Sequence, residues 1–155
     1  MSRPLDPAGD ALARAFWIAY GIGLLLCLGE PLLLQALLGG AIPPGAGAPG
    51  ETVRQLGYSF TGLTLVGALF VSRRSSRVRS GFGAVPAERR GALLAREILL
   101  YSILFNCVSV FGVVYYAMGG LEAERHARTF IALSSIMFFL FVPRLQAWRQ
   151  ATQRR

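Results

Sequence analysis

The chain alternates between long apolar runs and shorter segments rich in arginine, glycine and proline. A helix needs roughly 20 apolar residues to cross about 30 Å of hydrocarbon. Four runs approach or exceed this length, at about residues 15–38, 53–71, 98–118 and 127–142. The second and fourth are short, but Tyr58 and Trp148 extend them with side chains suited to the headgroup layer. The pattern predicts an all-α integral membrane protein: a single domain over residues 1–155 built as an antiparallel bundle of four transmembrane helices.

The distribution of arginine sets the expected direction of the chain, because short arginine-rich segments resist translocation. All 16 basic residues are arginine, and 13 of them lie in the N-terminal tail, in residues 73–96 or in the C-terminal tail. The three on the opposite side are Arg54, Arg125 and Arg128. With four spans, the three basic segments share one face. We therefore expect a multi-pass protein of a bacterial inner (plasma) membrane, with both termini and the basic loop 73–96 cytoplasmic.

The predicted inner loop contains residues that interrupt helices as well as arginines. Gly81, Gly83 and Pro86 predict a flexible segment lying against anionic lipid, where each arginine contributes about 1 kcal/mol. The arginines expected to contact lipid headgroups or a partner are Arg73, Arg74, Arg77, Arg79, Arg89 and Arg90. The positive-inside bias alone also produces such loops. Near the start of the third span, Glu97 is expected to form an ion pair with an arginine.

The two halves of the chain resemble each other faintly. Residues 59–64 match residues 129–134 in pattern, and a pair of glycines closes both the first and the third apolar run. Two duplicated helical hairpins, related by an axis along the membrane normal, would produce such a pattern. Chance similarity between leucine-rich helices is the alternative, and the sequence leaves both open.

Glu30 is the one carboxylate deep within a predicted span, and Pro31 follows it directly. The proline removes a backbone hydrogen bond to the carbonyl near Cys27, which predicts a bend and an unpaired acceptor beside the acid. An ionised carboxylate at this depth is costly, so Glu30 should be protonated or have a partner, for which Arg54 is a candidate. Small residues share this helical face at four-residue spacing: Ala15, Ala19, Gly23 and Cys27. The row predicts close helix packing, which places Glu30 inside the bundle.

Polar side chains at a similar depth provide the expected surroundings of Glu30. Thr61, Ser109 and Ser134 belong to the other three predicted spans, and Asn106 lies nearer the midplane. We therefore predict a site for a proton or cation formed by these residues and Glu30. The alternative is that they make ordinary interhelical contacts, each worth under about 1–2 kcal/mol. Tight packing is also expected on the second span, around Gly57, Thr61, Thr64 and Ala68.

Composition excludes several classes of protein. The chain is 54% hydrophobic and 15% charged, with a mean hydropathy of +0.49, unlike disordered or average soluble proteins. Cys27 and Cys107 lie in separate apolar runs, which argues against a disulfide scaffold. The single histidine, His126, falls in a predicted loop, which disfavours membrane-embedded haem. The sequence contains no cluster of metal ligands and no phosphate-binding glycine motif, so we expect no metal, no cofactor and no catalytic residues. Because membrane topology explains the arginines, we also expect no nucleic-acid partner.

Three functional hypotheses remain. The first is a non-enzymatic integral subunit or assembly partner of a larger membrane complex, preferred because four helices from one monomer rarely enclose a complete pathway. The alternative is a small proton- or cation-coupled transporter that works as a homo-oligomer through Glu30. The third is a membrane enzyme using Arg54, His126 and Arg128 at the outer surface. The expected partners are the lipid bilayer and either other membrane-spanning chains or further copies of this one.

Overall fold

The structure, a computed structural model, describes residues 7–153, with side chains described for residues 9–151. Its elements, in chain order, are α1 (Pro7–Leu24), the π-helical η1 (Leu25–Gly29), α2 (Glu30–Leu37), α3 (Gly50–Gly81), the 3₁₀ turn η2 (Phe82–Ala84), α4 (Ala87–Gly119), the 3₁₀ turn η3 (Gly120–Ala123), α5 (Glu124–Phe141) and α6 (Leu145–Gln153). Within this described part there is no strand, so the predicted all-α class is confirmed. Arg3, Arg154 and Arg155 lie outside the described residues.

Three segments are long and apolar enough to cross a membrane: Gly9–Leu37, Gly50–Ala84 and Ala87–Ala151. The third segment contains α4, η3, α5 and α6. The predicted membrane character is therefore supported, whereas the predicted bundle of four separate spans is not confirmed, because this criterion gives three segments.

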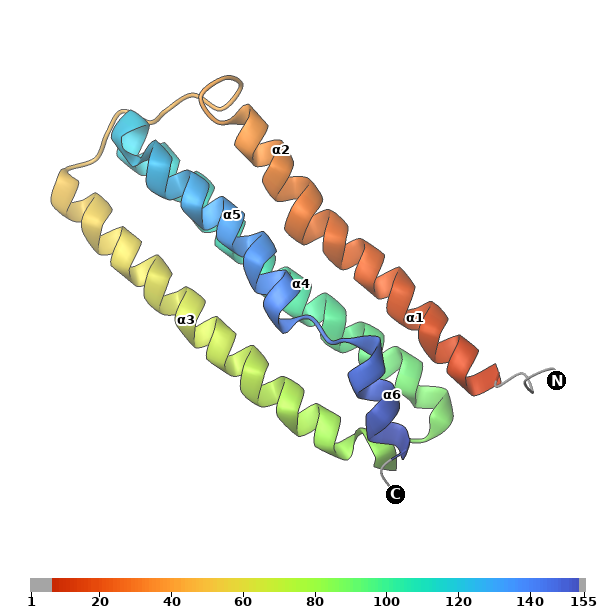
Figure 1. The fold of residues 1–155 in the computed structure, drawn as a ribbon. Coiled ribbons are helices and arrows are strands. Elements are labelled where there is room, and N and C mark those ends of the chain that lie inside the picture. Colours follow the sequence, from red (N-terminus) through yellow and green to blue (C-terminus); the bar gives the residue numbers. More distant parts are fainter. Residues whose placement is uncertain (1–6, 154–155) are drawn as a thin grey trace.

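Helix α4 lies at the centre of the arrangement and packs against α1, α3 and α5 (Figure 1). Figure 1 shows α5 running back along α4, with α1 and α3 on opposite sides of this pair. The turn between α3 and α4, the start of α1 and helix α6 lie at one end, while η3 and the connector from residue 38 to residue 49 lie at the other. The two proposed hairpins therefore pack differently: α4 contacts α5 along its length, whereas α1 and α3 are separated.

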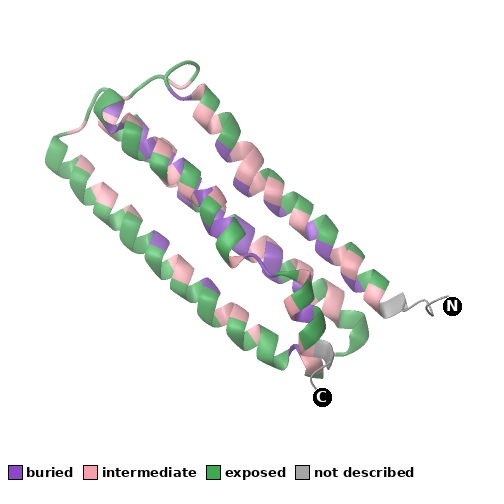
Figure 2. Ribbon diagram, viewed as in Figure 1, coloured by how far each residue is buried: buried purple, intermediate pink, exposed green. Residues whose placement is uncertain are grey.

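The core is formed mainly by α4 together with α1 and α5, and α3 takes little part in it. In the most apolar window of Ala87–Ala151, 44% of residues are buried, against 11% in that of Gly50–Ala84. Figure 2 shows the same contrast, with α3 mostly exposed. Close approach of α4 and α5 depends on Gly112, where a Cβ atom would lie 2.6 Å from the carbonyl oxygen of Ala127. A side chain larger than hydrogen at this position would push the two helices apart.

The expected tight packing on the second span is found at Thr64, which is buried, and at Gly57, where a Cβ atom would lie 3.1 Å from the Tyr115 ring, but it is wrong at Thr61. Thr61 is exposed, and its hydroxyl donates to the Gly57 carbonyl of its own helix at 2.8 Å. The half of α3 nearer residue 50 is held by aromatic contacts, including the stacked rings of Phe60 and Phe111 with centroids 4.5 Å apart. Small residues permit a close helix contact without enforcing one, and here no neighbouring helix lies against Thr61.

The predicted basic loop 73–96 is helical except for a short turn. Helix α3 continues to Gly81 and α4 begins at Ala87, so most of the arginines lie on these two helices. Arginine is a good helix former, and within residues 73–96 the only proline and two of the three glycines lie between Gly81 and Pro86. The turn is covered by α6, where Trp148 is buried and its ring meets that of Phe82 edge-on, with centroids 4.6 Å apart.

Candidate functional site

The first membrane-crossing helix is irregular where Pro31 was expected to disturb it. Residues Leu25–Gly29 form a π-helical segment, and the Glu30 amide donates to the Leu25 carbonyl, five residues back. Pro31 has no amide hydrogen to offer the carbonyl of Cys27, four residues earlier. That carbonyl instead accepts a 2.6 Å hydrogen bond from the Ser135 hydroxyl on α5. The irregularity is thus compensated by a side chain from another helix.

The row of small residues before Glu30 faces α4. At Gly23, a Cβ atom would lie 2.5 Å from the Ser102 hydroxyl oxygen, so no larger residue fits without movement. The Cys27 thiol donates to the Ser102 carbonyl at 3.2 Å, and Ala19 is buried. Closer to the start of α1, the Ala15 methyl lies 3.3 Å from where Gly91 would place a Cβ atom. These contacts bring the start of α2, and with it Glu30, against the middle of the α4–α5 pair.

The carboxylate of Glu30 is only weakly satisfied. Its Oε1 atom receives the Ser109 hydroxyl at a long 3.4 Å, while Oε2 is buried and has no partner among the described residues. Ser109 has a single hydroxyl proton, and its shorter contacts are with the Asn106 backbone carbonyl at 2.8 Å and the Asn106 side-chain oxygen at 3.2 Å. The geometry therefore leaves Glu30 with little hydrogen bonding for a charged oxygen pair.

Two further buried polar atoms at the same interface lack partners within the described part of the chain. They are the hydroxyls of Ser134 on α5 and Tyr116 on α4, and both residues are fully buried. Ser134 precedes Ser135, which bonds the Cys27 carbonyl, and Tyr116 packs with residues of α5 and the end of α2. Because buried polar groups are normally paired, three unpaired oxygen atoms along the α2–α4–α5 interface distinguish it from the rest of the core.

The structure brings together only part of the predicted site. Ser109 and Asn106 lie beside Glu30, and Ser134 lies on the facing helix. Thr61 is not among these residues, because it is exposed on α3 and bonded to its own backbone. The suggested counter-ion Arg54 pairs instead with Glu51 at 2.6 Å on the exposed start of α3.

A second buried carboxylate, Glu97, receives hydrogen bonds at both oxygens, and the sequence predicts only part of its surroundings. Arg74 on α3 donates to both Glu97 oxygens, from Nε to Oε2 at 2.7 Å and from Nη2 to Oε1 at 2.6 Å. The Tyr101 hydroxyl adds a third donor to Oε2 at 2.8 Å. The predicted pairing of Glu97 with an arginine is confirmed, whereas Arg74 is turned inward and away from the expected headgroup contact. The four-residue spacing of Glu97 and Tyr101 on one helix was the available signal for the third donor.

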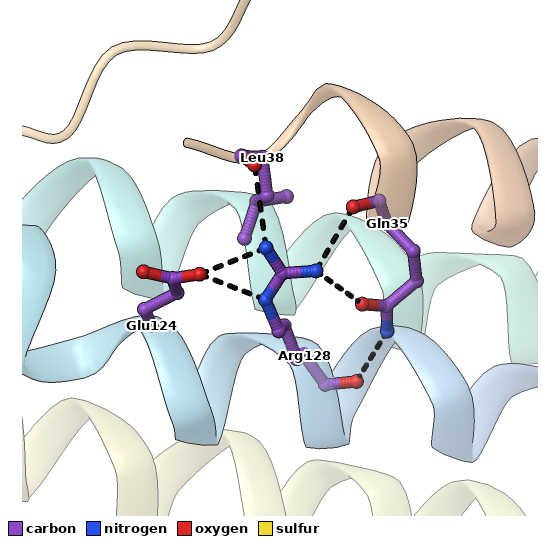
Figure 3. A network of polar contacts seen from close by, with 4 residues as sticks. All are labelled: Gln35, Leu38, Glu124 and Arg128. Atoms are coloured by element: carbon purple, nitrogen blue, oxygen red, sulfur yellow. Dashed lines mark hydrogen bonds and ion pairs between the residues drawn. The ribbon is translucent and has the colours of Figure 1, made fainter. Parts of the chain in front are cut away.

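At the other end of the molecule, Arg128 ties α5 to the end of α2 (Figure 3). Its guanidinium donates to the Glu124 carboxylate at 2.9 Å, the Gln35 carbonyl at 2.9 Å and the Leu38 carbonyl at 3.3 Å. The Gln35 side chain donates in return to the Arg128 carbonyl at 2.7 Å. A cation at the carbonyl end of a helix satisfies acceptors that the helix leaves unpaired. Arg128, which the sequence offers as a candidate for outer-surface chemistry, therefore makes structural contacts. Its hydrogen bonds with Gln35 were not predicted from the sequence.

Comparisons with known proteins give no match to a protein-family model, to a curated protein or to a solved structure. Within the described residues, no group of three or more histidine, cysteine, aspartate or glutamate side chains could hold a metal ion. The functional argument therefore rests on the geometry of the chain itself.

Proposed function

We propose that the chain is an integral protein of a bacterial inner membrane with four spans, formed by α1–α2, α3, α4 and α5. Helix α5 has 18 residues and rises about 27 Å, close to the thickness of the hydrocarbon core. It runs back along α4, as a separate fourth span would. An even number of spans leaves both ends of the chain on one side.

We also propose that the termini and the turn between α3 and α4 face the cytoplasm. The support is the distribution of charge, since 13 of the 16 arginines belong to the N-terminal tail, to residues 73–96 or to the C-terminal tail. A reporter fused after Arg155 or inserted at residues 82–86 should read cytoplasmic, and one at residues 42–50 should read external. The opposite result at any of the three positions overturns the orientation.

For function, we propose a small proton-coupled membrane carrier in which Glu30 binds the proton, with no enzymatic step. The observation that carries the proposal is the buried, unpartnered Oε2 atom of Glu30 next to a break in the helix. A charged carboxylate inside a membrane is expensive unless it is paired, and Glu30 has neither an arginine nor a short hydrogen bond. A protonated carboxyl, in contrast, is neutral and gains a donor for a nearby hydroxyl oxygen.

The first experiment asks whether Glu30 carries a proton in the membrane. Dicyclohexylcarbodiimide, a hydrophobic reagent, modifies protonated carboxyl groups in apolar surroundings, and peptide mass spectrometry locates the adduct. In native vesicles Glu30 should be modified, and the adduct should vanish in Glu30→Gln. The matched control is Glu88→Gln, which changes an exposed acid at the start of α4 and should leave the labelling unchanged. Absence of a Glu30 adduct overturns the proposal.

The second experiment asks whether the proton moves. Purified protein is placed in vesicles holding a trapped pH-sensitive dye, and a potassium diffusion potential drives proton entry. Entry should exceed that of empty vesicles for the wild type and for Glu88→Gln, and should fall to the empty-vesicle rate for Glu30→Gln. Equal rates in the wild type and Glu30→Gln would exclude Glu30 as the coupling residue.

The second candidate function, a subunit of a larger membrane complex, draws support from α3. Several of its large apolar side chains, including Leu65, Val66 and Leu69, are more than half exposed, and little of the helix joins the core. Such a helix could dock against a membrane-spanning helix of another chain. Extraction in mild detergent, followed by mass determination and identification of the chains, separates the two candidates. A particle containing other chains favours the subunit, and a particle made only of this chain favours the carrier.

A further inference from the structure

A cavity of about 570 Å³ opens between α1 and the junction of α5 with α6. One wall is aromatic and comes from α1, where Phe16 stacks on Tyr20 with centroids 5.4 Å apart and Trp17 stands edge-on to both rings. The opposite wall comes from the end of α5 and includes Phe139. Both walls are apolar, so the body of any ligand that fits here should be apolar as well.

The other end of the same cavity is polar and basic. Arg144, Gln146 and Arg149 line it where the chain passes from α5 into α6. Arg144 is exposed and takes part in none of the ion pairs found in the described part of the chain, whereas Arg149 already interacts within the protein. The cavity therefore combines an apolar body with a guanidinium free to bind an anion.

The position of the cavity fits a lipid in the cytoplasmic leaflet. It lies at the end of the molecule that holds α6 and the start of α1, which the arginine distribution assigns to the inner side. Tryptophan and tyrosine are typical of the boundary between hydrocarbon and headgroups, as Trp17 and Tyr20 would be here. A ligand there has its apolar part along the rings and its polar part at the arginine.

We propose that this cavity binds an anionic phospholipid, with its phosphate on Arg144 and an acyl chain along Phe16, Trp17 and Phe139. A guanidinium matches the geometry of phosphate oxygens and holds them through more than one hydrogen bond. A zwitterionic lipid offers the same phosphate but no net negative charge, so the site selects lipids by charge. The inference is independent of Glu30 and of the proton-coupled function.

The experiment uses tryptophan fluorescence, because the chain has two tryptophans and one of them lines the cavity. Trp148→Phe keeps an aromatic ring against Phe82 and leaves Trp17 as the only emitter. The variant is reconstituted in phosphatidylcholine vesicles with increasing amounts of brominated phosphatidylglycerol, whose bromine atoms quench nearby indoles. Brominated phosphatidylcholine provides the reference. Phosphatidylglycerol should quench with about fivefold higher apparent affinity, the ratio that corresponds to about 1 kcal/mol for one arginine.

Three variants in the same background make the result specific. Arg144→Gln should reduce the preference to about one, and Arg144→Lys should retain most of the preference, because discrimination between the two lipids depends on net charge, although both lipids should bind more weakly without the guanidinium. Arg89→Gln removes an exposed arginine near the same end that does not line the cavity, and should leave the preference intact. Circular dichroism and the emission maximum of Trp17 verify that each variant is folded.

Either of two quenching results overturns the proposal. One is equal quenching by the two brominated lipids in the Trp148→Phe protein. The other is a preference that falls equally in Arg144→Gln and Arg89→Gln, which would reflect general surface charge. Inorganic phosphate is added as a further arm, and removal of the preference by phosphate at constant ionic strength would assign the arginine to a soluble anion instead of a lipid.

Discussion

Glu97 and Glu30 are both glutamates with buried carboxylate oxygens, and they differ in the hydrogen bonds that these oxygens receive. Glu97 on α4 receives three short hydrogen bonds, two from Arg74 and one from Tyr101. Glu30 at the start of α2 receives one contact of 3.4 Å and leaves its second oxygen without a partner among the described residues. The first arrangement satisfies a charged carboxylate, and the second does not.

The difference follows from where each acid lies along its helix. Glu97 is in the first half of α4, within reach of an arginine whose helix continues beyond the apolar run. Glu30 lies at the start of α2 within an apolar segment, next to Ser109, whose hydroxyl also contacts Asn106, and neither of these side chains carries a charge. Charge pairing at a helix end stabilises a fold, whereas an unpaired acid in the apolar interior is suited to gaining and losing a proton. The following predictions test this division.

The largest effect is expected from Arg74→Ala. The substitution leaves Glu97 buried without its counter-ion, and breaking one side of a buried pair typically costs about 3–5 kcal/mol. Unfolding in detergent, followed by circular dichroism as denaturant is added, measures the loss in free energy of unfolding. Arg73→Ala removes the neighbouring exposed arginine and should change stability by less than about 0.5 kcal/mol.

A double substitution sharpens this first test. Replacing Arg74 and Glu97 together by methionine removes both charges and should recover much of the stability lost in Arg74→Ala. If the double variant were as unstable as the single one, the cost would come from lost packing and the description of Glu97 as a charge-paired anchor would fail.

The next effect is expected from Tyr101→Phe. The ring is fully buried and its hydroxyl donates to a charged acceptor, so its removal should cost about 1.5–3 kcal/mol. The same unfolding measurement applies. In the background of Glu97→Gln the cost should shrink, because the acceptor no longer carries a charge, and an unchanged cost would show that the hydroxyl acts elsewhere.

Much of the fold followed from the sequence, because hydrophobic length and glycine–proline punctuation determine where helices begin and end. The helical class and the irregularity beside Pro31 were predicted on these grounds. The predicted basic loop is too broad, because the arginines before Gly81 lie on α3 and arginine supports a helix. Charge indicates which side of a membrane a segment occupies, and it says little about whether the segment is helical.

The candidate site was less predictable, because depth along a span does not determine which face of a helix meets which neighbour. Thr61 has the depth of Glu30, yet α3 packs beside α4 on the side opposite α1, and the residue is exposed. The bond from the Ser135 hydroxyl to the Cys27 carbonyl likewise required knowing that α5 crosses next to η1. Periodicity gives the faces of single helices, and the order of helices around α4 comes only from the structure.

A smaller effect is expected from Ser135→Ala. The Cys27 carbonyl then loses the donor that replaces the missing Pro31 amide, at a cost of about 1 kcal/mol for a neutral hydrogen bond. Pro31→Ala supplies an amide hydrogen at position 31, so the Ser135→Ala penalty should be reduced in that background. A double-mutant cycle measured by unfolding gives the coupling energy, and a coupling of zero would separate the serine from the proline.

The smallest effect on stability is expected from Glu30→Gln. The amide has the same shape, no ion pair is lost and only one long hydrogen bond changes, so the free energy of unfolding should shift by less than about 1 kcal/mol. Carbodiimide labelling and proton entry should nevertheless disappear. Glu97→Gln should do the reverse, lowering stability while Glu30 remains labelled.

This crossed pattern is the sharpest form of the comparison, because each variant serves as the control for the other. If Glu30→Gln lowered the free energy of unfolding as much as Glu97→Gln, Glu30 would be a structural residue whose contacts stabilise the fold. If neither variant altered proton entry, both acids would be structural, and the loosely packed α3 would then favour a subunit of a larger complex. A loss of function without a loss of stability at Glu30 alone assigns the two carboxylates their separate roles.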